Sequence, residues 1–254
     1  MSLGKTVRIA YVYLHGFAGS AMSKKGLALR ETIPQMILPD LNPPNFCDFT
    51  VSSALERMDE LHREETEKLR LRFGTSAALK WRIVGSSLGG YVAAKWAEAN
   101  EESVDRMVLY CPALDLRRLW IDKLGREEIE TWKRTDAFAL PGPGGATVQM
   151  PFRFLKDVLD RHDAVPDLSH ETLILHGTKD EVVPFERSKS LVRALEKMRN
   201  GSPLNGRPDV SLMPIHHADH SLHDEIPTLL FNTLKFLGNI EHKPLVSEVA
   251  APLR

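Results

Sequence analysis

The sequence has few cysteines and no excess of charge of either sign. Its 254 residues include two cysteines, Cys47 and Cys111, which are too few and too far apart to predict a disulfide framework or a cysteine-rich metal site. Lys and Arg number 33 against 34 Asp and Glu, so no strong long-range field favours nucleic acid or an anionic membrane. We therefore expect a cytoplasmic protein, in a reducing compartment, whose partners are selected by a local site.

Long hydrophobic runs are also missing. No run approaches the roughly 20 apolar residues that a membrane-spanning helix needs, so membrane insertion is not expected. The opening MSLGKTVRIAYVYLHG contains an apolar run of only a few residues and lacks the small-residue cleavage site of a signal peptide. None of these features indicates an oligomeric state.

The sequence does contain a regular alternation of short β-rich runs and helical patterns. Apolar, β-branched and aromatic residues predict buried strands at 7–15, 36–41, 81–84, 104–111, 172–176 and 210–215. Apolar residues at three-and-four spacing predict helices at 24–32, 51–73, 88–102, 184–199 and 222–237. This alternation predicts an α/β fold with a mainly parallel sheet and helices on both faces.

One long segment, 114–168, interrupts the alternation. It contains the turn-forming PGPGG and three helical patterns, at 116–123, 126–134 and 152–161. We expect it to form an inserted cap, or lid, subdomain between two strands of a core made of 1–113 and 169–254. A polar loop is expected at 200–208 and a frayed tail from residue 241.

The most specific motif is GSSLG at 85–89, which fits G-x-S-x-G with Ser87 at its centre. It directly follows a predicted strand and opens a predicted helix, which is the context in which such a serine is a nucleophile. A glycine-rich turn of a nucleotide-binding fold is the alternative. However, the stretch lacks both the G-x-x-x-x-G-K-[ST] of a Walker loop and the G-x-G-x-x-G of a dinucleotide fingerprint.

A nucleophilic serine needs a histidine base and a carboxylate that orients the base. Asp180 follows a predicted strand, at the sheet edge where Ser87 would lie, and is our candidate acid; capping the next helix is its alternative role. His220, in the loop before the last predicted helix, is our candidate base. Three further histidines lie close by: His216, His217 and His223. A metal site is the alternative for this cluster, although no H-E-x-x-H spacing or carboxylate pair supports it.

Acyl transfer also needs N–H donors for the oxyanion. The N–H of Leu88, directly after the nucleophile, is one candidate, and the N–H of Phe17, in the loop after the first strand, is the other. Gly16 eases the turn in that loop. We expect the neighbouring His15 to make a structural hydrogen bond and not to act as the base.

Together these residues resemble the α/β-hydrolase superfamily over nearly the whole chain. The order Ser87, Asp180, His220 is the order of that superfamily. The segments YLHGFAGSAMSKKG, PDLNPP and HGTKDEVVP resemble small bacterial serine esterases of the YqiA-like kind. The resemblance implies Ser87 as nucleophile, Asp180 as acid, His220 as base, and Phe17 and Leu88 as oxyanion donors.

We therefore expect a serine hydrolase, a carboxylesterase that cleaves esters of small acyl groups through an acyl-enzyme, with no metal or organic cofactor. A thioesterase, a peptidase and a non-catalytic small-ligand-binding protein of the same fold are the alternatives. Six apolar residues of the predicted cap can either line the acyl site or pack the cap onto the sheet: Leu119, Trp120, Trp132, Phe138, Phe152 and Phe154.

If His220 is the general base, hydrolysis should slow at acid pH, because a protonated imidazole cannot accept the proton of Ser87. The rate on a p-nitrophenyl ester should fall between about pH 8 and about pH 5, with the product quantified after adjustment to alkaline pH. A rate that stays constant across this range in folded protein would contradict the assignment of His220.

Overall fold

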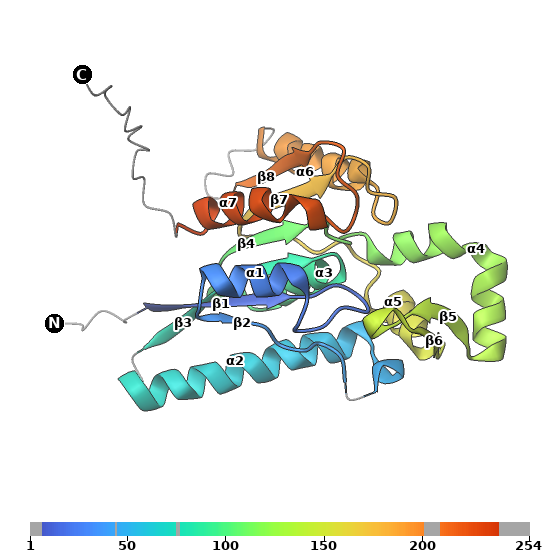
Figure 1. Ribbon diagram of the computed structural model, residues 1–254, viewed down its shortest axis with the longest axis horizontal. Helices are drawn as coiled ribbons and strands as arrows, with labels where there is room; N and C mark the ends of the chain where they lie inside the picture. Colours follow the sequence, from blue (N-terminus) through green and yellow to red (C-terminus); the bar gives the residue numbers. More distant parts are fainter. Residues whose placement is uncertain (1–6, 44, 75–76, 201–208, 239–254) are drawn as a thin grey trace, which may run out of the picture.

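The structure is a computed structural model that describes residues 7–43, 45–74, 77–200 and 209–238. The tail expected from residue 241 and most of the loop expected at 200–208 lie outside these residues. Strands in parallel register form one sheet in the order β2-β1-β3-β4-β7-β8 (Figure 1). Their bounds are β1 (Val7–Leu14), β2 (Met36–Ile37), β3 (Ala78–Ser86), β4 (Val104–Tyr110), β7 (Glu171–Gly177) and β8 (Val210–Ile215). The expected α/β fold with a parallel sheet is confirmed.

Helices cover both faces of this sheet. Alternate side chains of β1 show the division, because Val12 and Leu14 lie in one apolar cluster while Tyr11 and Tyr13 lie in another. The first cluster packs under α2 and α3, and the second packs under α1 and α7 (Figure 1). The bounds are α1 (Lys24–Thr32), α2 (Val51–Phe73), α3 (Leu88–Ala99), α6 (Phe185–Asn200) and α7 (Ile226–Phe236). No helix among the described residues is long and apolar enough to cross a membrane.

Two of the expected elements are shortened the most, although the helix expected at 88–102 also ends earlier, at Ala99. The strand expected at 36–41 is confined to Met36–Ile37, and Pro39, which lacks an N–H, cannot extend its ladder. The helix expected at 222–237 begins at Ile226 because Leu222 has a positive φ of 51°, which no α-helix accommodates. His223, expected in that helix, lies instead in a short 3₁₀ turn, His223–Glu225.

The segment between β4 and β7 contains α4 (Leu116–Thr135), β5 (Phe138–Pro141), β6 (Thr147–Met150) and α5 (Arg153–Arg161). Gly125, with φ 71°, kinks α4 at the gap between the two helices expected there. The antiparallel hairpin of β5 and β6 was not expected, although the predicted PGPGG turn joins its strands. Figure 1 shows the segment beyond the carboxyl ends of the sheet strands. That it forms a separate cap subdomain stays a prediction.

One partly buried carboxylate connects this segment to the core. Asp157 of α5 accepts hydrogen bonds from the N–H (3.0 Å) and hydroxyl (2.6 Å) of Ser52, at the start of α2. The carboxylate of Asp157 also lies 3.4 Å from Nε2 of His162 and 4.0 Å from Nε of Arg161. Burial by itself raises the pKa of Asp157, but the hydrogen bonds from His162 and Ser52 outweigh it and lower the pKa to about 2. The ionised carboxylate therefore stabilises the folded state.

Asp157→Asn should lower the free energy of unfolding by about 2 kcal/mol at neutral pH. Because the folded pKa lies below the ordinary value of about 3.9, this stabilisation is present above about pH 4 and is lost as the pH falls towards 2. Urea unfolding near pH 7 and near pH 3 should show a smaller pH effect in the variant than in the wild type.

The matched control is Asp160→Asn, which changes an exposed carboxylate on the same helix that pairs with exposed Lys156. It should change stability by less than about 1 kcal/mol. Equal pH dependence in Asp157→Asn and the wild type would contradict the stabilising role of Asp157.

Candidate active site

Ser87 lies in the sharp turn between β3 and α3. Its φ of 55° and ψ of −117° lie in a sparsely populated region that costs about 1–3 kcal/mol. The end of β4 holds this turn, because the N–H of Ser87 donates to the carbonyl of Tyr110 (2.8 Å). The carbonyl of Ser87 in turn accepts from the N–H of Ala113 (3.1 Å). The strain is thus maintained by hydrogen bonds to the neighbouring strand and its loop.

The glycines around Ser87 allow main chains to approach each other closely. A Cβ on Gly89 would lie 2.2 Å from the carbonyl oxygen of Leu14, at the end of β1. A Cβ on Gly85 would lie 2.5 Å from the carbonyl oxygen of Gly89. Both distances are impossible for real atoms, so only glycine allows β1, β3 and α3 to meet at this point.

Ser87, His220 and Asp180 form one hydrogen-bonded chain. Nε2 of His220 lies 2.9 Å from Oγ of Ser87, and Nδ1 of His220 lies 2.7 Å from Oδ2 of Asp180. The side chain of Asp180 is completely buried, whereas that of His220 is 22% exposed. The structure therefore brings together the three residues that the sequence predicted as nucleophile, base and acid.

The carboxylate of Asp180 is held on both oxygens. Oδ1 accepts from the N–H groups of Val182 (2.9 Å) and Val183 (2.8 Å), which precede α6, so Asp180 does not cap that helix. Oδ2 lies 3.2 Å from Nε2 of His176 in addition to its bond with His220. Burial alone raises the pKa of Asp180, but hydrogen bonds from His176 and His220 hold it well below the ordinary carboxyl value. Asp180 is therefore ionised at neutral pH.

The HGTKDEVVP segment also contains His176, whose role the sequence pattern does not indicate. It is fully buried, with Nε2 2.8 Å from the carbonyl oxygen of Val183 and Nδ1 2.9 Å from Oγ of Ser188. A carbonyl only accepts, so Nε2 of His176 carries a proton, and Nδ1 shares its hydrogen bond with the Ser188 hydroxyl. His176 therefore contacts the same carboxylate oxygen of Asp180 as His220 does.

The two candidate oxyanion donors lie next to Ser87. Leu88 is the first residue of α3, so its N–H has no carbonyl one turn earlier in the helix to bond. The loop that carries Phe17 is also close, since a Cβ on Gly16 would lie 3.3 Å from Cβ of Ser87. His15 makes the expected structural bonds: Nε2 accepts from the N–H of Leu41 (3.0 Å), and Nδ1 lies 2.9 Å from the carbonyl oxygen of Gly16.

The remaining histidines do not form a metal site with His220. His216 and His217 are exposed, and the His, Cys, Asp and Glu side chains of the described ranges yield one close group, Cys111, Asp180 and His220, with ligand atoms within 4.8 Å. Burial raises the pKa of the Cys111 thiol, which therefore stays protonated and is a poor metal ligand. Asp180 and His220 are already bonded to each other. This donor set does not fit a zinc ion.

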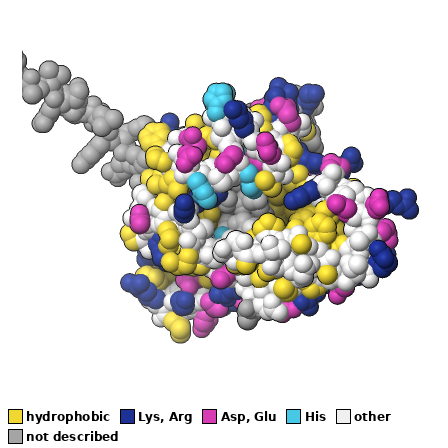
Figure 2. All heavy atoms as spheres, turned by 45° about the vertical axis from the view of Figure 1, so that its right-hand side comes forward, with side chains coloured by type: hydrophobic (Ala, Val, Ile, Leu, Met, Phe, Trp, Pro, Cys, Tyr) yellow, Lys and Arg dark blue, Asp and Glu magenta, His cyan; other side chains and the backbone are white. Residues whose placement is uncertain are grey.

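A cavity of about 300 Å³ opens at Ser87 and His220. Both oxyanion candidates line it, and three of the six expected cap residues do so as well: Leu119, Trp120 and Phe154. The other three pack within the segment, where Trp132 stacks on Phe138 with ring centroids 4.7 Å apart and also contacts Phe152. Figure 2 shows hydrophobic side chains gathered beside a hollow on this side of the molecule. Three of the six residues therefore line the cavity at Ser87, and the other three pack against one another.

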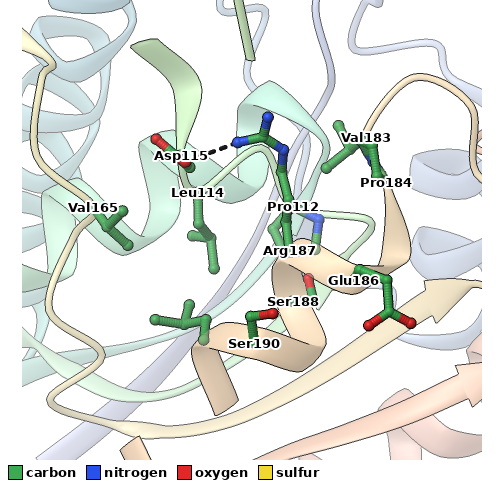
Figure 3. A pocket seen from close by; sticks show the side chains of 11 residues that line it. Pro112, Leu114, Asp115, Val165, Val183, Pro184, Glu186, Arg187, Ser188 and Ser190 are labelled. Atoms are coloured by element: carbon green, nitrogen blue, oxygen red, sulfur yellow. Dashed lines mark hydrogen bonds and ion pairs between the residues drawn. The ribbon is translucent and has the colours of Figure 1, made fainter. Parts of the chain in front are cut away.

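A second cavity, of about 540 Å³, lies on the other side of Val183, which lines both cavities (Figure 3). An ion pair between Arg187 and Asp115, at 2.7 Å, crosses its rim. Ser188, which bonds His176, is also on its wall. None of the residues of the Ser87 chain lines this cavity, so the reactive groups belong to the smaller one.

Comparison with known proteins places the chain in a family. The model of the Uncharacterised protein family (UPF0227) matches residues 10–200. The chain belongs to this family. The likeness to solved structures identifies the fold as that of the α/β-hydrolase superfamily, which confirms the resemblance seen in the sequence.

Two solved structures illustrate this likeness. Est1E from Butyrivibrio proteoclasticus has a TM-score of 0.67 and 15% identity, covering 93% of this chain and 89% of its own. Alpha/beta hydrolase domain-containing protein 10 from mouse has a TM-score of 0.65 and 19% identity, and the match covers 91% of this chain and 90% of the mouse chain. At these identities the likeness concerns the fold.

Two curated relatives match more closely in sequence but over a shorter region. Protein ABHD12B from Homo sapiens is 29% identical over 175 residues, 68% of this chain and 44% of its own length. Palmitoyl-protein thioesterase ABHD10, mitochondrial, from Rattus norvegicus is 26% identical over 145 residues, 55% of this chain and 45% of its own. The matched regions thus span less than half of either relative.

Gly89→Ala should lower the free energy of unfolding by about 3 kcal/mol or more, because the new Cβ would collide with the end of β1. The urea unfolding midpoint measures this loss. The control is Gly144→Ala, where φ is 73° but no atom lies within 4 Å, so the cost should be about 1 kcal/mol. Similar losses in the two variants would contradict the role of close main-chain packing at Ser87.

Proposed function

We propose that the protein is a serine hydrolase that cleaves carboxylic esters of small acyl groups. The observation that carries this proposal is the hydrogen-bonded chain from Ser87 through His220 to Asp180, open to an apolar cavity at the Ser87 end. A non-catalytic binding protein would need a cavity, but it would have no use for a strained serine next to a base with a buried, ionised partner.

In the proposed reaction, His220 takes the proton of Ser87 through Nε2 while Oγ attacks the ester carbonyl. The imidazolium that forms is stabilised by Asp180 through Nδ1, and Asp180 is kept ionised by its own hydrogen bonds. His220 then protonates the leaving alcohol. A water molecule releases the acyl group from Ser87 by the same steps, so no proton is lost from the site.

The negative oxygen of each tetrahedral intermediate would be held by the N–H groups of Phe17 and Leu88. Loss of one such donor typically costs ~2.7–4 kcal/mol of transition-state stabilisation. Leu88 adds the favourable field of the first turn of α3. The ring of Phe17 is held among aromatic side chains, with its centroid 5.1 Å from that of Phe154 and 5.2 Å from that of Phe46, which limits movement of this loop.

The cavity supports a preference for small apolar acyl groups. Its volume of about 300 Å³ is at the lower end for ligand sites, and most of its surface comes from Leu, Ala, Val and aromatic side chains. The lysine among its lining residues is Lys123, whose Nζ lies 5.5 Å from the ring centroid of Trp120. A thioester is the second candidate bond, because one relative is named as a palmitoyl-protein thioesterase.

Ser87→Ala should lower kcat/KM for p-nitrophenyl butyrate by about 10⁴-fold or more, since the variant cannot form the acyl-enzyme. The neighbouring Ser86→Ala is the matched control. Ser86 is buried and contacts Tyr13, not His220, so this variant should keep most of the activity. A fluorophosphonate probe should label the wild type and Ser86→Ala but not Ser87→Ala.

The same set of proteins separates the alternatives. Rates on matched butyryl ester, butyryl thioester and peptide amide substrates decide which acyl bond is preferred. Full ester hydrolysis by purified Ser87→Ala would refute the proposed nucleophile. Absence of both labelling and hydrolysis in the folded wild type would favour a binding protein.

A further inference from the structure

The SKKG segment, residues 23–26, belongs to the esterase-like opening of the sequence, yet the proposed mechanism does not use it. The structure shows how it starts α1. The hydroxyl of Ser23 accepts from the N–H of Gly26 at 3.3 Å, which caps the helix. A Cβ on Gly26 would lie 2.8 Å from the ring of Tyr13, so the first turn lies directly on β1. The position of the two lysines between these residues is therefore set tightly.

The two lysines have different surroundings. Lys24 is exposed, whereas Lys25 is half-buried and its Nζ donates to the carbonyl oxygen of Ser221 at 2.8 Å. Burial lowers the pKa of Lys25, while the nearby carboxylates of Asp219 and Asp180 act in the opposite direction. Burying an amine is unfavourable unless its protons are accepted. The fold therefore maintains the contact between Lys25 and Ser221 even though burial disfavours the charged amine.

Ser221 is the residue directly after His220. Before His220, its loop is held by the loop that carries Asp180, since the N–H of Lys179 donates to the carbonyl of Ala218 (2.9 Å). The hydroxyl of Thr178 also accepts from the N–H of His217 (2.9 Å). Lys25, which is 196 positions away in sequence, provides the corresponding contact after His220.

This loop depends on such contacts because its backbone is strained. His217 has a φ of 63° and Leu222 a φ of 51°, both in the left-handed region that is unfavourable for these residues. The His220 side chain itself is bonded only to its two partners in the Ser87 chain, among the described residues. The position of the imidazole is therefore set by the loop on either side of it.

We propose that Lys25 is a positioning residue that holds the loop of His220 so that Nε2 stays in line with Oγ of Ser87. The proposal rests on the proposed hydrolase function. Misplacement of a reacting group by about 1 Å can cost as much as 10²-fold in rate. Loss of the Lys25 contact should therefore affect the proton-transfer steps more than the binding of the ester.

The test compares Lys25→Met with Lys24→Met, its exposed neighbour on the same helix turn. With p-nitrophenyl butyrate, Lys25→Met should lower kcat about tenfold and change KM by less than about twofold. Rates are expressed per site labelled by a fluorophosphonate probe, which counts only competent protein. Lys24→Met should behave as the wild type. Lys25→Arg, which keeps a charged donor, should recover part of the loss.

Two additional measurements separate positioning from a purely structural role. The downfield NMR resonance of the Nδ1 proton between His220 and Asp180 should shift or broaden in Lys25→Met and not in Lys24→Met. Lys25→Gln, which shortens the side chain and removes the charge, provides a second variant if Lys25→Met does not fold.

Equal kcat per labelled site in the folded Lys25 and Lys24 variants, or a lower melting temperature with unchanged kcat, would overturn the proposal. These outcomes differ from failure of the proposed function. In that case, the wild type would not hydrolyse the ester, or hydrolysis would survive Ser87→Ala.

Discussion

The strained turn at Ser87 is the constraint on which the rest of the structure depends. Its backbone conformation costs about 1–3 kcal/mol by itself and persists because β1, β4 and α3 meet there at main-chain contact distance. Gly85 and Gly89 permit this approach, and the carbonyl of Tyr110 accepts the N–H of Ser87. The parallel sheet ends at the same edge, so the loops after β1, β7 and β8 converge on the serine.

The second constraint is the buried negative charge of Asp180, which needs hydrogen bonds from the protein because no solvent reaches it. Asp180 has no exposed side-chain surface, and such a carboxylate would normally become protonated. Two backbone N–H groups, His176 and His220 supply the missing hydrogen bonds. Val182 and Val183 provide these N–H groups and also line the cavity at Ser87. The ionisation of Asp180 and the shape of this cavity therefore depend on one loop.

The segment between β4 and β7 contributes walls to the site and also supports its loops. Phe17 shows this coupling, since its ring packs against Trp120 of α4 and Phe154 of α5 while the residue also lines the cavity at Ser87. The bond from Ser52 to Asp157 then connects α5 to the start of α2. Packing of this segment and geometry at Ser87 are therefore linked through aromatic contacts.

The sequence alone predicted the six sheet strands along the chain and their mainly parallel pairing, but not their order in the sheet. It also predicted the helix starts at Lys24 and Val51, and Ser87, His220 and Asp180 as one set. These follow from residue periodicity and turn chemistry, which are properties of neighbouring positions. The β5–β6 hairpin was missed because strands of four residues are too short to show a period. Only the tertiary structure decided which apolar residues face the cavity. It also decided that His176 contacts Asp180 and that Lys25 contacts the loop of His220. Burial and contacts between distant segments depend on how the elements pack, and no local pattern encodes that packing.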